Sequence, residues 1–300
     1  MNVSEKVREN FCYGCGACKS ICPVKAINII EDRYGFLKAN VDRKICIDCG
    51  KCLETCPRIN NVFENSDNPE CYASWAKDEI RCTSASGGIF SAIASEFLKR
   101  ENHYVAGAVW KENYYVSHIV TNNKDDLTRI QNSKYVQSNT ENVYEDVKAL
   151  IENGNKVLYS GTPCQIAGLY AFLGGKNDNL FTIDLICHGV PSTKVLQKYL
   201  KDSYNGKEIK RLDFRDKSVF GWSSEMNIYM ADDEEVHTRA GKDSFYQAFL
   251  SNLSLSPNCE NCQFSRLPRQ GDISIGDFWN IEKFDKSLND RKGTSLVLVN

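Results

Sequence analysis

Two stretches of this sequence repeat one another: residues 12–23 read CYGCGACKSICP, and residues 46–57 read CIDCGKCLETCP. Both have the spacing C-x2-C-x2-C-x3-C-P. The constant offset is 34 residues, from 12 to 46 at the first cysteine and from 22 to 56 at the fourth. Together they hold eight of the 14 cysteines of the chain. The repeat predicts two copies of one small metal-binding loop.

This spacing is typical of a two-cluster ferredoxin. Three thiolates on one tight loop can hold one 4Fe-4S cubane, and the fourth reaches across to the other cluster. The predicted ligands of the first cluster are Cys12, Cys15, Cys18 and Cys56, and those of the second are Cys46, Cys49, Cys52 and Cys22. Structural zinc or disulfides are the alternatives, but zinc leaves the third cysteine and the proline of each motif unexplained.

Composition indicates a soluble globular protein, with 42% hydrophobic and 25% charged residues among 300. Lys and Arg number 37 against 39 Asp and Glu, and this lack of a basic excess argues against nucleic acid as a partner. No apolar run reaches the roughly 18 residues of a membrane span. The N-terminus has no apolar signal core. We therefore predict a cytoplasmic protein, in which short cysteine spacings indicate metal rather than disulfides.

The chain reads as two domains, of mixed α+β and α/β class. A polar stretch from Asn60 to Glu70 indicates a linker. Residues 1–68 are expected to form the ferredoxin-type domain and residues 69–300 a larger mixed α/β domain. The chain stops inside the apolar run 296–299, so we expect the larger domain to be incomplete at its C-terminus.

Apolar patterning predicts the main elements of the larger domain. Residues 104–110 and 116–120 are expected to be paired strands. Residues 157–159 and 181–186 are expected to be buried strands, each followed by a helix. Further strands are expected at 212–214, 226–230, 236–238, 273–278 and 296–299, and further helices after Gly88, at 142–152 and at 244–253.

Four later cysteines suggest a third metal site. Cys164 and Cys187 each follow a predicted strand, and ligands gather at the carboxyl ends of strands in an open α/β sheet. Cys259 and Cys262 form a C-x2-C pair. Four thiols at one edge of the sheet could bind a third iron–sulfur cluster or zinc. The alternative is that they are small core cysteines that bind nothing. Cys71 and Cys82 lack metal spacing and are interpreted as core or surface thiols, and His188 as a hydrogen-bonded structural residue.

A flavin is the usual link between single electrons and a hydride, and several residues are candidates for binding one. Ser84-Ala-Ser-Gly-Gly88 precedes a predicted helix and could hold a phosphate, although a simple cap is the alternative. Lys134 and Tyr135 could supply a charge and a stacking ring, or be a solvated lysine and a packed tyrosine. Asp277 could accept a hydrogen bond from a flavin ring or a ribose, or it could simply belong to a turn.

Six ordered motifs resemble those of the family of coenzyme F-420 hydrogenase/dehydrogenase beta subunits, over essentially the whole chain. They are Ser86-Gly87-Gly88, Ser133-Lys134-Tyr135, residues 160–165, residues 187–192, the pair Cys259 and Cys262, and residues 271–279. The resemblance implies FAD and a third 4Fe-4S cluster in the larger domain. It implies the cluster ligands Cys164, Cys187, Cys259 and Cys262, and the flavin contacts Ser86, Gly87, Gly88, Lys134 and Tyr135.

The expected function is that of a flavin-dependent iron–sulfur oxidoreductase. Electrons would pass between a ferredoxin-like donor, the clusters and FAD, to reduce or oxidise a small organic substrate or a deazaflavin-type coenzyme. The alternative is an electron-transfer subunit with no substrate site of its own, serving a partner enzyme; the resemblance extends to bacterial proteins found beside surface-polysaccharide biosynthesis enzymes. A non-redox zinc protein is a third hypothesis. No catalytic residue is assigned.

Overall fold

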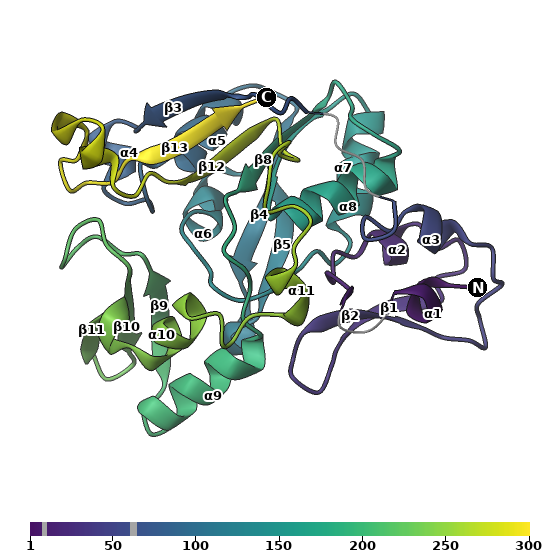
Figure 1. Ribbon diagram of the computed structural model, residues 1–300, viewed down its shortest axis with the longest axis horizontal. Helices are drawn as coiled ribbons and strands as arrows, with labels where there is room; N and C mark the ends of the chain where they lie inside the picture. The colour runs from purple at the N-terminus through teal and green to yellow at the C-terminus, as the bar shows by residue number, and fades with distance from the viewer. Residues whose placement is uncertain (8–10, 61–64) are drawn as a thin grey trace.

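The computed structural model describes residues 1–7, 11–60 and 65–300. Residues 61–64 of the predicted linker lie outside this description. Figure 1 shows a small N-terminal unit beside the larger part of the chain, which consists of a broad sheet with helices and a second, smaller sheet. The arrangement is mixed α/β with a ferredoxin-like unit in front, as the sequence predicts.

The small unit is a two-stranded hairpin flanked by single-turn helices. Strands β1 (Ile27–Glu31) and β2 (Leu37–Val41) pair antiparallel, and the helices are α1 (Val3–Lys6), α2 (Ala17–Ser20) and α3 (Lys51–Glu54). Both cysteine motifs fold alike, because Gly16 and Gly50 precede their helices with φ of +85° and +78°. That left-handed backbone suits glycine, and it turns each motif around its own hollow.

The large sheet has eight strands in the described residues, in the order β3-β13-β12-β8-β7-β4-β5-β6. Its inner strands β12, β8, β7 and β4 run parallel. The carboxyl ends of these four strands therefore share one edge. In chain order the strands are β3 (Glu70–Ser74), β4 (His103–Trp110), β5 (Val116–Thr121), β6 (Ser138–Asn139), β7 (Lys156–Gly161), β8 (Leu180–Leu185), β12 (Ile273–Asp277) and β13 (Ser295–Val299).

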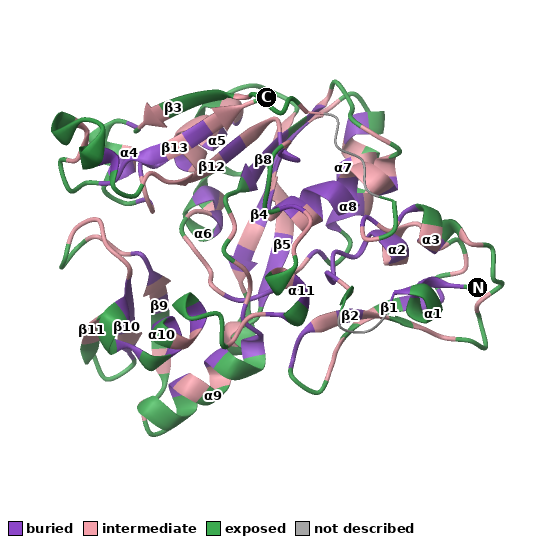
Figure 2. Ribbon diagram, viewed as in Figure 1, coloured by how far each residue is buried: buried purple, intermediate pink, exposed green. Residues whose placement is uncertain are grey.

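Helices cover both faces of this sheet. Alternate residues of β7 contribute to the hydrophobic cores on opposite faces of the sheet. On one face, Val157 and Tyr159 pack with α7 (Val143–Glu152) and α8 (Pro163–Leu173). On the other face, Leu158 packs with α5 (Ile89–Phe97) and α6 (Leu127–Ile130). Figure 2 shows buried residues along the strands and α8 between these layers. The remaining short helices of this region are α4 (Asp78–Arg81), η2 (Glu112–Tyr114), η3 (Lys124–Asp126), η5 (Ile281–Lys283) and η6 (Lys286–Leu288).

A separate three-stranded sheet packs against helices at the lower left of Figure 1. Its strands β9 (Ile209–Phe214), β10 (Glu225–Met230) and β11 (Glu235–Arg239) are antiparallel. Leu212, Phe214, Met226 and Ile228 share a core with α9 (Thr193–Ser203) and α10 (Ser244–Leu250). The turn η4 (Ala240–Lys242) precedes α10, and α11 (Pro257–Glu260) leads back toward the small unit.

One predicted pairing is confirmed, that of β4 with β5, and the structure adds the pairing of β7 with β8. Strands β4 and β5 are antiparallel neighbours, and β7 and β8 are parallel neighbours, so Cys164 and Cys187 follow adjacent strands. The hairpin β1–β2, the edge strand β3 and the division into two sheets were outside the prediction. None of the helices in the described ranges is long and apolar enough to cross a membrane.

Candidate functional site

The first cysteine set lines a small hollow. Its lining includes Cys12, Cys15, Cys18 and Cys56, so the fourth cysteine of the second motif lies with the first three of the first motif. Burial raises the pKa values of Cys15, Cys18 and Cys56 above their ordinary value, and neighbouring thiols act in the same direction. These thiols resist losing their protons unless a positive group enters the hollow.

The second cysteine set lines another small hollow. Cys22, Cys46, Cys49 and Cys52 all line it, together with Gly50. Cys49 is exposed, whereas Cys52 is buried and has a pKa raised by that burial. The fourth cysteine of each motif therefore lines the hollow of the other motif: Cys56 lies with the first motif and Cys22 with the second.

This donor arrangement fits a cubane better than a single ion. Among the residues with described positions, no three or more His, Cys, Asp or Glu side chains converge closely enough to hold one metal ion. Four thiols around one hollow instead match the ligation of a 4Fe-4S cluster by four cysteines, in which each cysteine sulfur binds a different iron atom. The individual ligand assignments remain predictions.

The third cysteine set lies where β7 and β8 end. Cys164 is in the first turn of α8, Cys187 follows β8, and Cys259 and Cys262 come from α11 and the loop after it. All four thiols are half-buried, and the charges of Cys187, Cys259 and Cys262 each act on the pKa of Cys164. Burial, followed by Cys259, raises the pKa of Cys187 to about 12. The four thiols are therefore near enough to affect one another electrostatically, and their chemistry suits a soft metal or cluster.

Direct hydrogen bonds join the first and third cysteine sets. Asn258 Nδ2 donates to the carbonyl oxygen of Cys12 at 3.3 Å, and Gln263 Nε2 donates to that of Pro57 at 2.5 Å. Both donors flank the Cys259–Cys262 pair. The ring of Tyr13 lies 5.4 Å from that of Phe264, and the charges of Cys262 and Cys164 both act on the pKa of Tyr13. The two cysteine sets thus form one continuous unit across the domain junction.

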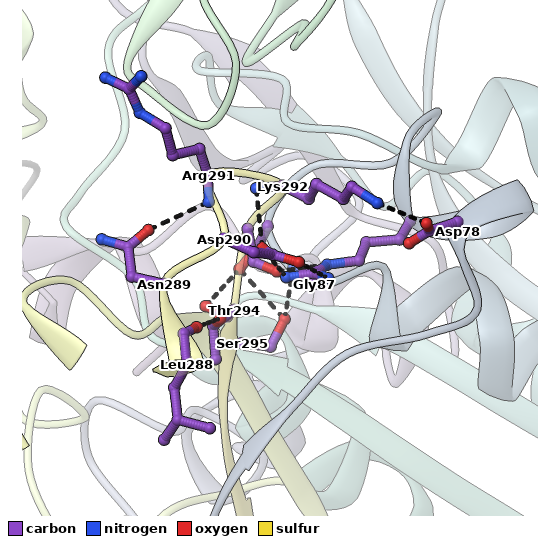
Figure 3. Close-up of polar contacts among 12 residues, drawn as sticks. Asp78, Gly87, Leu288, Asn289, Asp290, Arg291, Lys292, Thr294 and Ser295 are labelled. Carbon is purple, nitrogen blue, oxygen red and sulfur yellow. Dashed lines mark hydrogen bonds and ion pairs between the residues drawn. The ribbon is translucent and has the colours of Figure 1, made fainter. Parts of the chain in front are cut away.

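The Ser86-Gly87-Gly88 turn is held by the loop before β13, as Figure 3 shows. The Gly87 N–H donates to Ser295 Oγ at 2.9 Å, and Ser86 Oγ donates to the carbonyl of Thr294 at 3.2 Å. A Cβ on Gly87 would lie 2.5 Å from the carbonyl oxygen of Ser74, so this position requires glycine. The turn begins α5 with Gly88 in the left-handed conformation.

Lys134 and Tyr135 both have internal partners. The Lys134 ammonium donates to the carbonyls of Ile130, Gln131 and Asn132 at 3.0–3.3 Å, which caps α6. Burial lowers the pKa of Lys134 to about 7. The Tyr135 ring packs among Phe214, Tyr246 and Phe249. Any phosphate or flavin contact by these two residues would add to, or replace, these interactions.

Asp277 lies at the end of β12 in a buried ion pair with Arg215. The two contacts are 2.7 and 2.8 Å, and Trp222 Nε1 donates to Asp277 at 2.7 Å. Burial acts to raise the pKa of Asp277, but Arg215 outweighs it and holds that pKa below its ordinary value. Arg215 also donates to the Tyr135 hydroxyl at 3.4 Å and lies over the ring of Trp279.

Arg215 and Lys217 were not identified from the sequence; they are two cations that hydrogen-bond to several of the predicted flavin contacts. Arg215 joins Asp277 to Tyr135, and Lys217 donates to the carbonyls of Ser86, Arg81 and Lys292. These cations occur after β9 in a polar stretch with no motif spacing, so no sequence pattern marks them. Trp222 stacks on Trp279 with ring centres 4.8 Å apart, and only the second belongs to a recognised motif.

Three residues that the sequence analysis set aside have other positions or contacts. His188 contacts the Phe249 carbonyl through Nε2 at 3.2 Å and packs edge-on against the Phe249 ring. Cys71 in β3 and Cys82 after α4 are both exposed. They provide cysteines suitable as controls.

Comparison with known proteins identifies both parts of the chain. Residues 154–300 match the family described as the C terminus of the coenzyme F420 hydrogenase/dehydrogenase beta subunit, and residues 11–60 match the 4Fe-4S dicluster domain. The chain is 23% identical over 297 residues to the F subunit of the F(420)H(2) dehydrogenase of Methanosarcina mazei. That alignment covers 93% of this chain and 80% of the relative.

Two further matches are more distant or more partial. The coenzyme F420-dependent sulfite reductase of Methanocaldococcus jannaschii is 28% identical over 176 residues, covering 56% of this chain and 26% of that relative. A chain of the xenon-derivatised F420-reducing NiFe hydrogenase complex of Methanosarcina barkeri superposes with a TM-score of 0.52 at 19% identity. That superposition covers 79% of this chain and 76% of the other, and it shows a shared fold.

The matches agree with the arrangement of the cysteines. The dicluster domain contains the first and second cysteine sets, and Cys164, Cys187, Cys259 and Cys262 all fall inside the match to the beta subunits. The chain is therefore an iron–sulfur protein with 4Fe-4S clusters in its N-terminal domain. It belongs to the family of coenzyme F420 hydrogenase/dehydrogenase beta subunits.

Proposed function

We propose that this protein is an iron–sulfur flavoprotein oxidoreductase that carries electrons between a redox partner protein and a small-molecule substrate. It would hold a third 4Fe-4S cluster and FAD in the larger domain. The observation that carries this proposal is the junction between the first and third cysteine sets. Asn258 and Gln263, on either side of the Cys259–Cys262 pair, bond directly to the backbone of the first and second cysteine motifs.

The proposed ligands follow the three cysteine sets. Cys12, Cys15, Cys18 and Cys56 would hold one cluster, Cys22, Cys46, Cys49 and Cys52 the second, and Cys164, Cys187, Cys259 and Cys262 the third. When bound, the clusters supply one-electron transfer and FAD converts single electrons into hydride chemistry. The chain's own contribution is to bring the thiols of each set together, most of them at least partly buried.

The proposed flavin site lies around Arg215 at the carboxyl end of β12. Ser86, Gly87 and Gly88 would face the flavin from the start of α5, with Lys134, Tyr135 and Asp277 around it. Arg215 orients the carboxylate of Asp277 and reaches the hydroxyl of Tyr135. Both relatives named above act with coenzyme F420, so a deazaflavin is the first substrate to test.

The decisive experiment is to purify the full chain anaerobically and to measure iron, acid-labile sulfide and released flavin. About 12 iron and one FAD per chain are expected for three cubanes and a flavin. The matched variants are Cys187→Ser, which should lose about four iron, and Cys71→Ser, which should lose none because Cys71 lies in β3 and lines neither of the two hollows. A wild-type chain with about eight iron and no flavin would refute the third cluster and the FAD.

A second candidate function is that of an electron-transfer subunit which depends on a partner for its substrate site. The relative that is similar over most of its length is named as a subunit, which favours this alternative. The two functions differ in one assay. Reduction or oxidation of coenzyme F420 by the loaded chain alone supports the enzyme, whereas reduction of the clusters by dithionite without any turnover supports the subunit.

A further inference from the structure

Lys38 is a buried cation in a strand whose neighbouring residues are half-exposed. It is 5% exposed in the middle of β2, where Asn40 is exposed. Ala39 and Val41 contribute to the ferredoxin core, and side chains alternate along a strand. Lys38 therefore points away from that core. Its ammonium donates to the carbonyl oxygen of Cys12 at 3.1 Å.

Burying this charge requires compensation. An ammonium without a counter-charge costs several kcal/mol in a protein interior. Over residues 1–7, 11–60 and 65–300, no carboxylate oxygen lies within 4.0 Å of Lys38 Nζ. The ring centre of Phe36 is 5.8 Å away, and a contact of that kind supplies only a weak electrostatic attraction. The described contacts of Lys38 are thus a carbonyl dipole and an aromatic ring, and within the described residues they include no carboxylate.

The groups around Lys38 belong to two cysteine sets. The Cys12 carbonyl that it contacts also accepts from Asn258, which is next to Cys259. Lys38 thus lies between the first and the third cysteine sets, where ligated clusters would carry net negative charge.

We propose that Lys38 is the counter-charge shared by the first and third cysteine sets, and that it raises the reduction potential of the cluster each set holds. The inference rests on the proposed function, because it requires both clusters. A reduced cluster carries one more negative charge than an oxidised one, so a nearby cation favours the reduced state. The effect is strong because Lys38 is screened from water.

The test is an anaerobic potentiometric titration of the full chain, followed by electron paramagnetic resonance. Lys38→Gln retains a donor for the Cys12 carbonyl but removes the charge, and Lys38→Arg retains the charge. Lys19→Gln is the matched control, since Lys19 is next to Cys18 but donates to Glu141 and Asn142 in an exposed position. The second cysteine set provides an internal control in every sample.

For Lys38→Gln we expect more negative midpoints for the first and third clusters. The expected shift is at least tenfold in the oxidised-to-reduced ratio at a fixed potential, which is about 59 mV for one electron. Lys38→Arg, Lys19→Gln and the second cluster should keep wild-type midpoints. Unchanged midpoints in Lys38→Gln with full iron content, or an equal shift in Lys19→Gln, would overturn the proposal.

Failure of cluster assembly is also informative. If Lys38→Gln loses iron and Lys38→Arg does not, the charge itself is required, which supports the proposal. If both lose iron, Lys38 has a packing role and the proposal is wrong. Failure of the proposed function is distinguishable, because it appears as missing iron in the wild-type chain, before any variant is made.

Discussion

Cys15 packs against the backbone of Gly168, so closely that a Cβ at residue 168 would lie 2.9 Å from the Cys15 sulfur. Gly168 is in the middle of α8, whose first turn contains Cys164. One helix therefore contacts the first cysteine set along its side and contributes to the third at its start. The distance between the two sets depends on this close packing.

Gly168→Ala should disrupt the first cysteine set. The added methyl would also lie 3.1 Å from the Tyr144 hydroxyl, so neither neighbour leaves room for it. Overpacking of this kind costs about 1–3 kcal/mol. We expect a lower apparent Tm and about four iron fewer per chain. Gly241→Ala is the control, since a Cβ there meets nothing within 4 Å. Full iron in Gly168→Ala would show that the loop moves freely.

Thr140→Val should weaken the domain junction without changing its shape. Thr140 is buried, and its hydroxyl donates to the Cys15 carbonyl at 3.0 Å. Leaving that buried carbonyl unpaired costs about 1–3 kcal/mol. We expect faster loss of iron to a chelator in Thr140→Val, and near wild-type rates in Thr140→Ser, which keeps the hydroxyl. Equal rates in the two variants would contradict this role for the hydrogen bond.

Asp277→Ala should be more damaging than removal of both partners of its ion pair. The single change leaves the Arg215 guanidinium buried without its carboxylate, which costs about 3–5 kcal/mol. We expect the double variant Arg215→Met/Asp277→Ala to recover part of the lost stability, as measured by apparent Tm. Both variants should lose flavin if the proposed site is correct. Wild-type flavin content in both variants would contradict this location of the flavin site.

Lys134 should make stability rise with pH. Burial lowers its pKa in the folded protein to about 7, whereas the unfolded chain keeps the ordinary value of about 10.4. Between these values the unfolded state binds more protons, so a higher pH favours the folded state. We expect the apparent Tm of wild type to gain more than that of Lys134→Met between about pH 7.5 and 9.5. The exposed Lys124→Met serves as the control, and identical pH profiles for wild type and Lys134→Met would refute the effect.

Local patterns determined the ferredoxin unit and much of the secondary structure. The 34-residue repeat alone predicts that the fourth cysteine of each motif joins the other motif's cysteines. The reason is that three thiols on one short loop leave the fourth unable to reach the same cluster. Strands β4, β5, β7 and β8 were evident from short apolar runs. The positions of Cys164 and Cys187 after such strands already indicated one rim, and the parallel pairing of β7 with β8 confirms that they follow neighbouring strands.

Tertiary structure alone decided how the parts connect. Asn258, Thr140 and Lys38 contact the Cys12–Cys15 loop from positions 26–246 residues away in sequence. Arg215 joins Asp277 to Tyr135 in the same long-range way. Such contacts leave no periodicity, because a hydrogen bond or a counter-charge depends on distance in space and not on separation along the chain. The sequence thus determined the cysteine motifs themselves, while the fold determined that the first and third cysteine sets meet at the Cys12 carbonyl.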